Sequence, residues 1–238
     1  MGDGKESQGQ APTDSSKTAS SNKKGMSMSK LLVPFQDHFL GRVTYRDGRA
    51  LVDIKKRFVE LGLIERAEES PFKKFLLASE FHFLGVLVHE LMLRKIATQK
   101  EDEVHFFLGL KSCRFSVRNF SLVTGLNFSF AASQAELDEH LTSDRLINEH
   151  FNDVEKVKLL QLENAFKTCI VVEDVYKLGL CLLVEGVLNS IERNLNIWRD
   201  ILKIIKDINN FFSYPWGKFS YKRLLNSCKK GMQRLKAN

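Results

Sequence analysis

Apolar residues recur three or four positions apart over most of the chain, which is the spacing of one face of an α-helix. The first clear instance is the set Leu51, Ile54, Phe58 and Leu61. Gly62 follows this set and is suited to the left-handed conformation that often ends a helix. The pattern predicts a helix over residues 49–61.

The same criterion predicts helices along much of the remaining chain. Ser70-Pro71 has the form of an N-cap followed by a proline in the first turn, so a second helix should run through Leu76. Ser133 and Glu136 have the spacing of a capping box and should begin another short helix. Further predicted helices lie at residues 84–92, 144–150, 153–166, 173–191 and 197–211.

The C-terminal end contains a predicted break and a last helix. Tyr214-Pro215 should stop the preceding helix, because proline disfavours the helical conformation of the residue before it. Ser220 should then cap a final helix. Its apolar face would consist of Leu224, Leu225, Cys228, Met232 and Leu235.

Residues 103–126 follow a different pattern. Apolar and other side chains alternate with a period of two over residues 104–108, and an extended pattern resumes at residues 114–115 after a small polar turn. This arrangement predicts a short β-hairpin. Ser116 should cap a helix after the hairpin, and Gly125 should end it.

These elements predict a mainly α fold, with a single helical domain over residues 30–238 that contains one short β-hairpin. Residues 1–29 offer almost no apolar side chains to bury, so we expect a disordered N-terminal tail. The start of the chain has no apolar signal-peptide core, and charges interrupt the most apolar stretch, Cys169–Ile191. We therefore expect an intracellular chain, with the nucleus as one candidate compartment, that is neither secreted nor membrane-spanning.

The formal charge of +7 is concentrated at the C-terminal end. Residues 217–238 contain no acid, and on a helix their basic side chains would surround the apolar stripe. Such a face is suited to nucleic-acid phosphates, and the alternative is a solvated helix surface. The candidate nucleic-acid contacts are Lys222, Arg223, Lys229, Lys230 and Arg234.

Trp216 belongs to the most distinctive local cluster, Tyr214-Pro-Trp-Gly217. Tryptophan concentrates binding energy at interfaces, so Trp216 is a candidate interface anchor. The alternative is that Trp216 fills the edge of the core while Gly217 takes a positive φ angle in a turn. The sequence favours this structural alternative.

The reactive side chains do not form a recognisable catalytic motif. Cys113 lies in the predicted turn between two basic residues, which favours a thiolate, and His105 across the hairpin is the nearest candidate base. Cys169 and Cys181 lie on apolar helices and should be core residues. Because no wider signature accompanies Cys113, we expect a chain without a catalytic site.

Metal, cofactor and small-molecule sites are not predicted either. His82 and His89 are seven residues apart, whereas two metal ligands on one helix normally stand four apart. The sequence contains neither of the glycine-rich loops that cradle phosphates. We therefore expect no cofactor and no bound metal, and an unidentified protein as the main partner.

Three stretches taken in order resemble a known plant family. They are Arg114–Leu126, Lys177–Leu188 and Tyr214–Tyr221. Their order and spacing resemble the plant domain of unknown function numbered nineteen eighty-five and, more distantly, the aminotransferase-like plant mobile domain. The resemblance covers roughly residues 35–232. It implies an association with Mutator-like transposon proteins, in which this domain often precedes a SUMO-protease (ubiquitin-like cysteine protease) domain.

The chain stops at Asn238, which leaves no room for a protease domain, so the resemblance implies an accessory domain without its enzyme. The leading expectation is a non-catalytic interaction or scaffold domain of transposon origin. One alternative is a nuclear nucleic-acid-binding accessory domain that uses the basic C-terminal helix. Another is an accessory domain for a SUMO-protease-like cysteine peptidase whose catalytic domain is encoded separately.

Overall fold

The computed structural model describes residues 31–40, 49–78, 84–109, 111–129 and 144–236, with the backbone alone described for 230–236. The expected tail and the expected helix start at Ser133 lie outside these residues. Within them the fold is mainly helical with a small three-stranded antiparallel sheet, so the predicted fold class is confirmed. None of these helices combines the length and apolar character that are needed to cross a bilayer.

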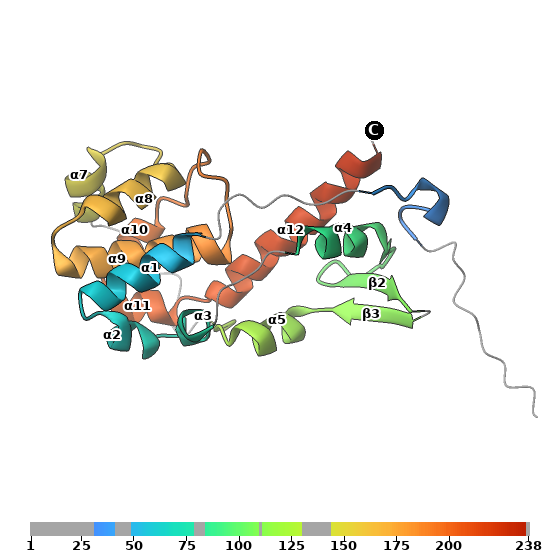
Figure 1. Ribbon diagram of the computed structural model, residues 1–238, viewed down its shortest axis with the longest axis horizontal. Coiled ribbons are helices and arrows are strands. Elements are labelled where there is room, and N and C mark those ends of the chain that lie inside the picture. Colours follow the sequence, from blue (N-terminus) through green and yellow to red (C-terminus); the bar gives the residue numbers. More distant parts are fainter. Residues whose placement is uncertain (1–30, 41–48, 79–83, 110, 130–143, 237–238) are drawn as a thin grey trace, which may run out of the picture.

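Most of the helices form one group, the helical body (Figure 1). It consists of α1 (Arg49–Glu60), α2 (Ile64–Glu68), α7 (Arg145–Phe151), α8 (Leu159–Thr168), α9 (Val172–Leu182), the π-helical turn η3 (Leu183–Leu188), α10 (Ile201–Ile204) and α11 (Ile208–Ser213).

A second group, the sheet group, lies beside the helical body (Figure 1). It consists of η2 (Phe35–Asp37), α4 (Gly85–Leu93), β1 (Lys95–Ile96), β2 (Val104–Leu108), β3 (Lys111–Phe115) and α5 (Val117–Thr124). The short helix α3 (Lys73–Leu77) reaches α5, because Lys74 Nζ donates to Leu122 O at 3.0 Å. The long helix α12 (Trp216–Lys236) starts at the helical body and runs along the sheet group (Figure 1).

The core of the helical body surrounds α9, in which every residue from Val175 to Leu182 except Lys177 is buried. Phe58 of α1 packs against Phe166 and Tyr176, with ring centroids 6.3 and 5.6 Å apart. Gly179 permits this close approach, since an added Cβ would lie 2.6 Å from the Phe58 ring. The predicted central helix over 173–191 is confirmed as far as Leu188, with its last part wound as the π-helical turn η3.

The sheet packs against α12 through a smaller apolar cluster. Val104 of β2 lies against Tyr221 and Leu225 of α12 in this cluster. Tyr221 also donates its hydroxyl hydrogen to Asp102 O at 2.7 Å, just before β2. The first part of α12 therefore belongs to the core of the helical body, and its middle covers one face of the sheet.

Several local predictions are confirmed. The helix over 49–61 is α1, and Gly62 after it has a φ angle of 67°. The hairpin is β2 and β3, to which the short strand β1 adds a third strand. Ser116 begins α5, where its backbone N–H donates to Asn119 Oδ1 at 3.0 Å, and Gly125 ends the helix with a φ angle of 70°.

The prediction of one helix over 197–211 is wrong. Two short helices, α10 and α11, occupy this range, because Asp207 accepts hydrogen bonds from the N–H groups of Asn209 and Asn210 and so starts a new helix. Two further boundaries shift: α8 begins at Leu159 rather than at 153, and the helix after Ser70 begins at Lys73. The short helix α2 was not predicted.

The start of the last helix also differs from the prediction. Tyr214 is extended and ends α11 as expected, but α12 begins at Trp216, directly after the proline. Ser220 is therefore buried inside the helix rather than at its cap, and its hydroxyl donates to Asn189 Oδ1 at 2.9 Å. Gly217 does not have a positive φ angle. It permits close packing instead, since an added Cβ would lie 2.4 Å from the Phe128 ring.

Candidate functional site

Three exposed lysines, Lys218, Lys222 and Lys229, lie along the solvent side of α12, and we call them the lysine stripe. At 3.6 residues per turn they fall within about 40° of one another around the helix axis and extend over about 16 Å along it. Tyr221 and Leu225 hold a neighbouring side of the helix against the sheet. The packing of α12 therefore fixes the direction in which the stripe faces.

The lysine stripe has no acidic counterpart among the residues that the structure describes. The sequence of α12 contains no aspartate or glutamate. No ion pair joins a described carboxylate to Lys218, Lys222 or Lys229. The three ammonium groups thus form a row of positive charge that remains open to an anionic partner.

The five predicted nucleic-acid contacts separate into three groups. Lys222 and Lys229 belong to the lysine stripe, which also includes Lys218. Arg223 points into the protein, where it pairs with Glu185. The side chains of Lys230 and Arg234 lie outside the described part of α12.

Arg223 pairs with Glu185, a fully buried carboxylate on η3, at 3.2 Å. Burial raises the pKa of Glu185, and the nearby positive charge of Arg223 opposes this rise. The Arg223 guanidinium also lies over the Phe219 ring, 5.7 Å from its centroid. The prediction of Arg223 as a nucleic-acid contact is therefore corrected: its charge compensates a buried carboxylate within the fold.

Trp216 is only 1% exposed, so the prediction of an interface anchor is wrong. Its indole Nε1–H donates to Phe211 O at 2.7 Å. The ring contacts those of Tyr214 and Phe211, with centroids 4.5 and 4.8 Å away. Trp216 fixes the first turn of α12 in the core and leaves no surface for a partner.

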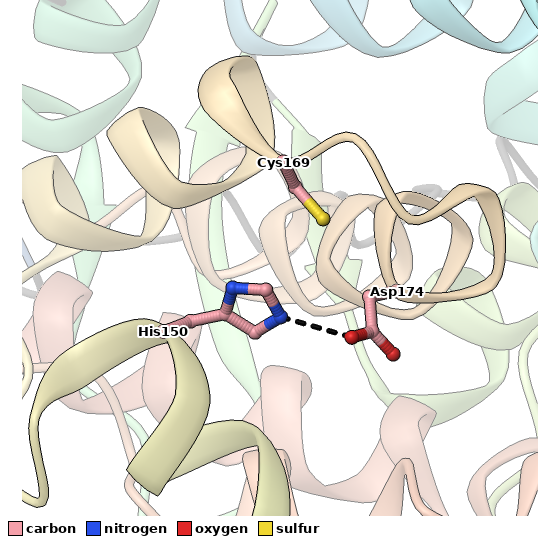
Figure 2. A group of neighbouring side chains, drawn as sticks. All are labelled: His150, Cys169 and Asp174. Atoms are coloured by element: carbon pink, nitrogen blue, oxygen red, sulfur yellow. Dashed lines mark hydrogen bonds and ion pairs between the residues drawn. The ribbon is translucent and has the colours of Figure 1, made fainter.

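Within the described part of the chain, one group of side chains could offer ligands to a metal ion: His150, Cys169 and Asp174, which come from α7, the end of α8 and α9 (Figure 2). One donor atom from each lies within 4.8 Å of the others. His150 Nε2 donates to Asp174 Oδ2 at 3.0 Å, and Figure 2 shows no such bond to Cys169. The Cys169 thiol instead donates to Val171 O at 3.6 Å.

Arg145 closes this cluster against other ligands. Its guanidinium donates to both carboxylate oxygens of Asp174, one of them at 3.1 Å. Burial alone would raise the pKa of Asp174, but the hydrogen bonds from Arg145 and His150 outweigh it and hold the pKa below its ordinary value. A metal ion at Asp174 would have to displace a bidentate guanidinium. The geometry therefore favours an ion-pair network of Arg145, His150 and Asp174, which joins α7 to α9 and which we call the Asp174 network.

The Asp174 network leads to a prediction about pH. Because the pKa of Asp174 is lower in the folded state, its ionised carboxylate stabilises the fold at pH values above the ordinary carboxyl pKa. This stabilisation is lost as the pH falls through the folded-state pKa. Asp174→Asn should lower the free energy of unfolding at pH 7 by about 1–2 kcal/mol, a discounted value because Arg145 is half exposed. Urea unfolding between pH 3 and pH 7 should show a smaller acid-induced loss in the variant. Equal losses in the two proteins would contradict this role.

Cys113 and His105 do not form a nucleophile and base pair. Cys113 lies within β3 rather than in a turn, opposite Phe106, whereas His105 lies opposite Arg114. Successive side chains of a strand point to opposite faces, so the thiol and the imidazole face away from each other. His105 donates instead to Glu103 Oε2 at 2.9 Å.

The other cysteines and histidines considered in the sequence as reactive or metal-binding groups are buried wherever the structure describes them. Cys169 and Cys181 are buried, as expected. His89 is buried and donates to Phe39 O at 3.0 Å, while His82 lies outside the described residues.

A small cleft between α1 and α8 contains two ion pairs. Lys167 pairs with Asp53 at 2.8 Å, and Arg193 donates from Nε to Glu163 at 2.7 Å. These pairs engage both carboxylates of the lining, Asp53 and Glu163, within the fold. The cleft is lined by Arg49, Ala50, Asp53, Glu163, Lys167, Leu182 and Arg193.

Two features of these sites were not predicted from the sequence. The bond between Arg145 and Asp174 joins residues 29 positions apart, and no local motif indicates it. For Glu185, the sequence indicated that a carboxylate inside an apolar helix requires a partner, but it did not identify Arg223 as that partner.

Comparison with protein-family models gives a match to more than half of the chain. The family model described as "Domain of unknown function (DUF1985)" matches residues 92–227, which include the sheet, the Asp174 network and the lysine stripe except Lys229. No curated protein and no solved structure matches the chain.

Proposed function

Because this chain belongs to the DUF1985 family, whose description assigns no activity, we propose that it is a non-catalytic interaction domain whose helix α12 binds a nucleic-acid backbone. The observation that supports this proposal most is the lysine stripe. Lys218, Lys222 and Lys229 are exposed, aligned and without carboxylate partners among the described residues. A row of ammonium groups complements the repeated charge of a phosphate backbone and gains free energy from released counterions.

The proposed binding does not depend on sequence. Lysine ammonium groups meet phosphates as point charges, and base readout requires side chains that reach base edges in a groove. The lysine stripe contains only lysines, so duplexes of unrelated sequence should bind with equal affinity.

The binding role is tested with the full chain and a fluorescently labelled DNA duplex. Replacing all three lysines of the stripe by alanine should weaken binding at 50 mM salt by at least about tenfold, because the phosphate contacts are lost. Alanine favours a helix at exposed positions, so the fold should be unaffected. Fluorescence anisotropy measures the affinity, and circular dichroism confirms the fold.

A matched control removes the same charge elsewhere. Lys73, Lys156 and Lys206 are exposed and lie on separate segments of the chain. Replacing these three by alanine should weaken binding by only about twofold, through the change in net charge alone. Equal losses in the two triple variants would refute a defined site on α12.

The proposal that the chain is non-catalytic is supported by the contacts and orientations of its potentially reactive side chains. Asp174 is engaged by Arg145 and His150, and Cys113 faces away from His105. An enzyme that acts through a nucleophile needs a base within hydrogen-bond reach of it. These arrangements support a role of the side chains in the stability of the fold.

Transposon origin and the association with SUMO proteases also belong to the proposal. They follow from the family resemblance and agree with a nuclear compartment, where DNA is the abundant polyanion. A coding stretch for a SUMO-protease-like domain beside this gene would support the association, and its absence in related genomes would count against it.

A further inference from the structure

Among the residues that the structure describes, none pairs with the outer edge of the sheet along β3. The strand order is β1-β2-β3, so β3 has one hydrogen-bonded neighbour, and its residues from Lys111 to Arg114 are all exposed. Figure 1 shows no labelled element on the outer side of β3. The opposite edge, along β1, is partly covered, because Leu31 forms a β-bridge with Ile96 and so extends the sheet beyond β1.

The register shows which backbone groups of β3 face outward. The Phe107 N–H donates to Arg94 O at 2.8 Å, on the side away from β3. In an antiparallel ladder, the residue opposite such a position also directs its N–H and C=O away from the pair. The residue opposite Phe107 is Ser112, and Arg114 follows by alternation. Ser112 and Arg114 therefore offer their main-chain donors and acceptors to a further strand.

The surroundings of this edge are positively charged. Lys111 and Arg114 lie on β3, and Arg118 is exposed in the first turn of α5. Residues 104–135 contain no acid at all. The carboxylate of Glu103 lies 3.6 Å from the Arg114 guanidinium and also binds His105.

We propose that the β3 edge binds an extended acidic segment of a partner protein as a fourth strand. The outward groups of Ser112 and Arg114 include donors and acceptors, which a peptide backbone matches and a phosphate backbone, having only acceptors, does not. A second copy of this chain is disfavoured, because pairing two β3 edges would bring Lys111 and Arg114 near their own counterparts. This surface goes beyond the proposed nucleic-acid site and is separate from it.

The test uses the full chain and a labelled seven-residue peptide that alternates valine and glutamate. Binding should raise the fluorescence anisotropy of the peptide and slow hydrogen exchange at the Ser112 and Arg114 amides. Ser112→Pro should weaken binding about fivefold or more, because it removes an outward donor. The ladder to β2 should persist, since this N–H takes no part in it.

Two variants make the result specific. Ser112→Ala keeps the N–H group and should bind as the unmodified chain does. Lys111→Glu should weaken binding about threefold through charge reversal without changing the backbone.

Several outcomes would overturn the proposal. They are no binding of the peptide, unchanged binding in both Ser112→Pro and Lys111→Glu, or equal protection of the two amides by an alternating valine–lysine peptide. Equal protection by single-stranded DNA would assign the edge to nucleic acid instead. Binding of duplex DNA by the Ser112→Pro variant should stay normal, so failure of this proposal is distinguishable from failure of the α12 site.

Discussion

Replacing Trp216 by alanine is expected to lower the free energy of unfolding by about 3–5 kcal/mol, the range for removing a large aromatic side chain from a core. The ring is 1% exposed and packs among the aromatic side chains at the junction of α11 and α12. Its loss would leave a cavity where α12 enters the helical body. Urea unfolding followed by circular dichroism measures the difference.

The Trp216→Phe variant serves as the comparison. Phenylalanine fills part of the space but removes the Nε1–H that donates to Phe211 O, so a loss of about 1–3 kcal/mol is expected. A Trp216→Ala protein with unchanged stability and a lost protein partner would restore the interface-anchor interpretation.

The second large effect concerns Arg223. Arg223→Ala should lower the free energy of unfolding at pH 7 by about 3 kcal/mol, because Glu185 would remain buried without its compensating charge. This value is at the low end of the range for breaking a buried pair, since about a third of the Arg223 side chain is exposed. Chemical denaturation of the variant and the unmodified chain measures it.

The pH dependence of this variant follows from the raised pKa of Glu185. A carboxyl whose pKa is higher in the folded state favours folding when protonated, so its stability cost grows as the pH rises through the folded-state pKa. The deficit of Arg223→Ala should therefore shrink as the pH is lowered towards the ordinary glutamate value. The double variant Glu185→Gln/Arg223→Ala should recover part of the stability at pH 7. A deficit that is independent of pH and persists in the double variant would contradict this account.

Local patterns in the sequence were sufficient to predict many of the helices and strands. The apolar spacing around Ile54 gave α1, and the alternation over residues 104–108 gave the hairpin, because both patterns reflect which side of a single element is buried. The stop at Tyr214 followed from the geometry of proline.

Errors arose where one pattern extended across a capping residue. The apolar positions Ile204 and Ile208 have helical spacing, which suggested a single helix. Asp207 lies between them and caps α11 with its carboxylate, so the backbone turns there although the spacing continues. The capping preference of aspartate was visible in the sequence but was outweighed by the longer pattern.

The interactions between elements were not predictable from one sequence. Arg223 and Glu185 are 38 residues apart, and only the packing of α12 on η3 makes them a pair. The same limit explains why Arg223 was grouped with the surface lysines. The stripe itself could be partly foreseen, because residues 217–238 lack acids, but the inclusion of Lys218 required the true start of α12 at Trp216.

The salt dependence of DNA binding tests the central claim most directly, namely that α12 presents the lysine stripe to a phosphate backbone. Each phosphate neutralised contributes about 0.9 to the slope of log affinity against log salt concentration. The unmodified chain should thus show a slope steeper by about 2.7 than the variant in which Lys218, Lys222 and Lys229 are alanine. Identical slopes for the two proteins would contradict the account.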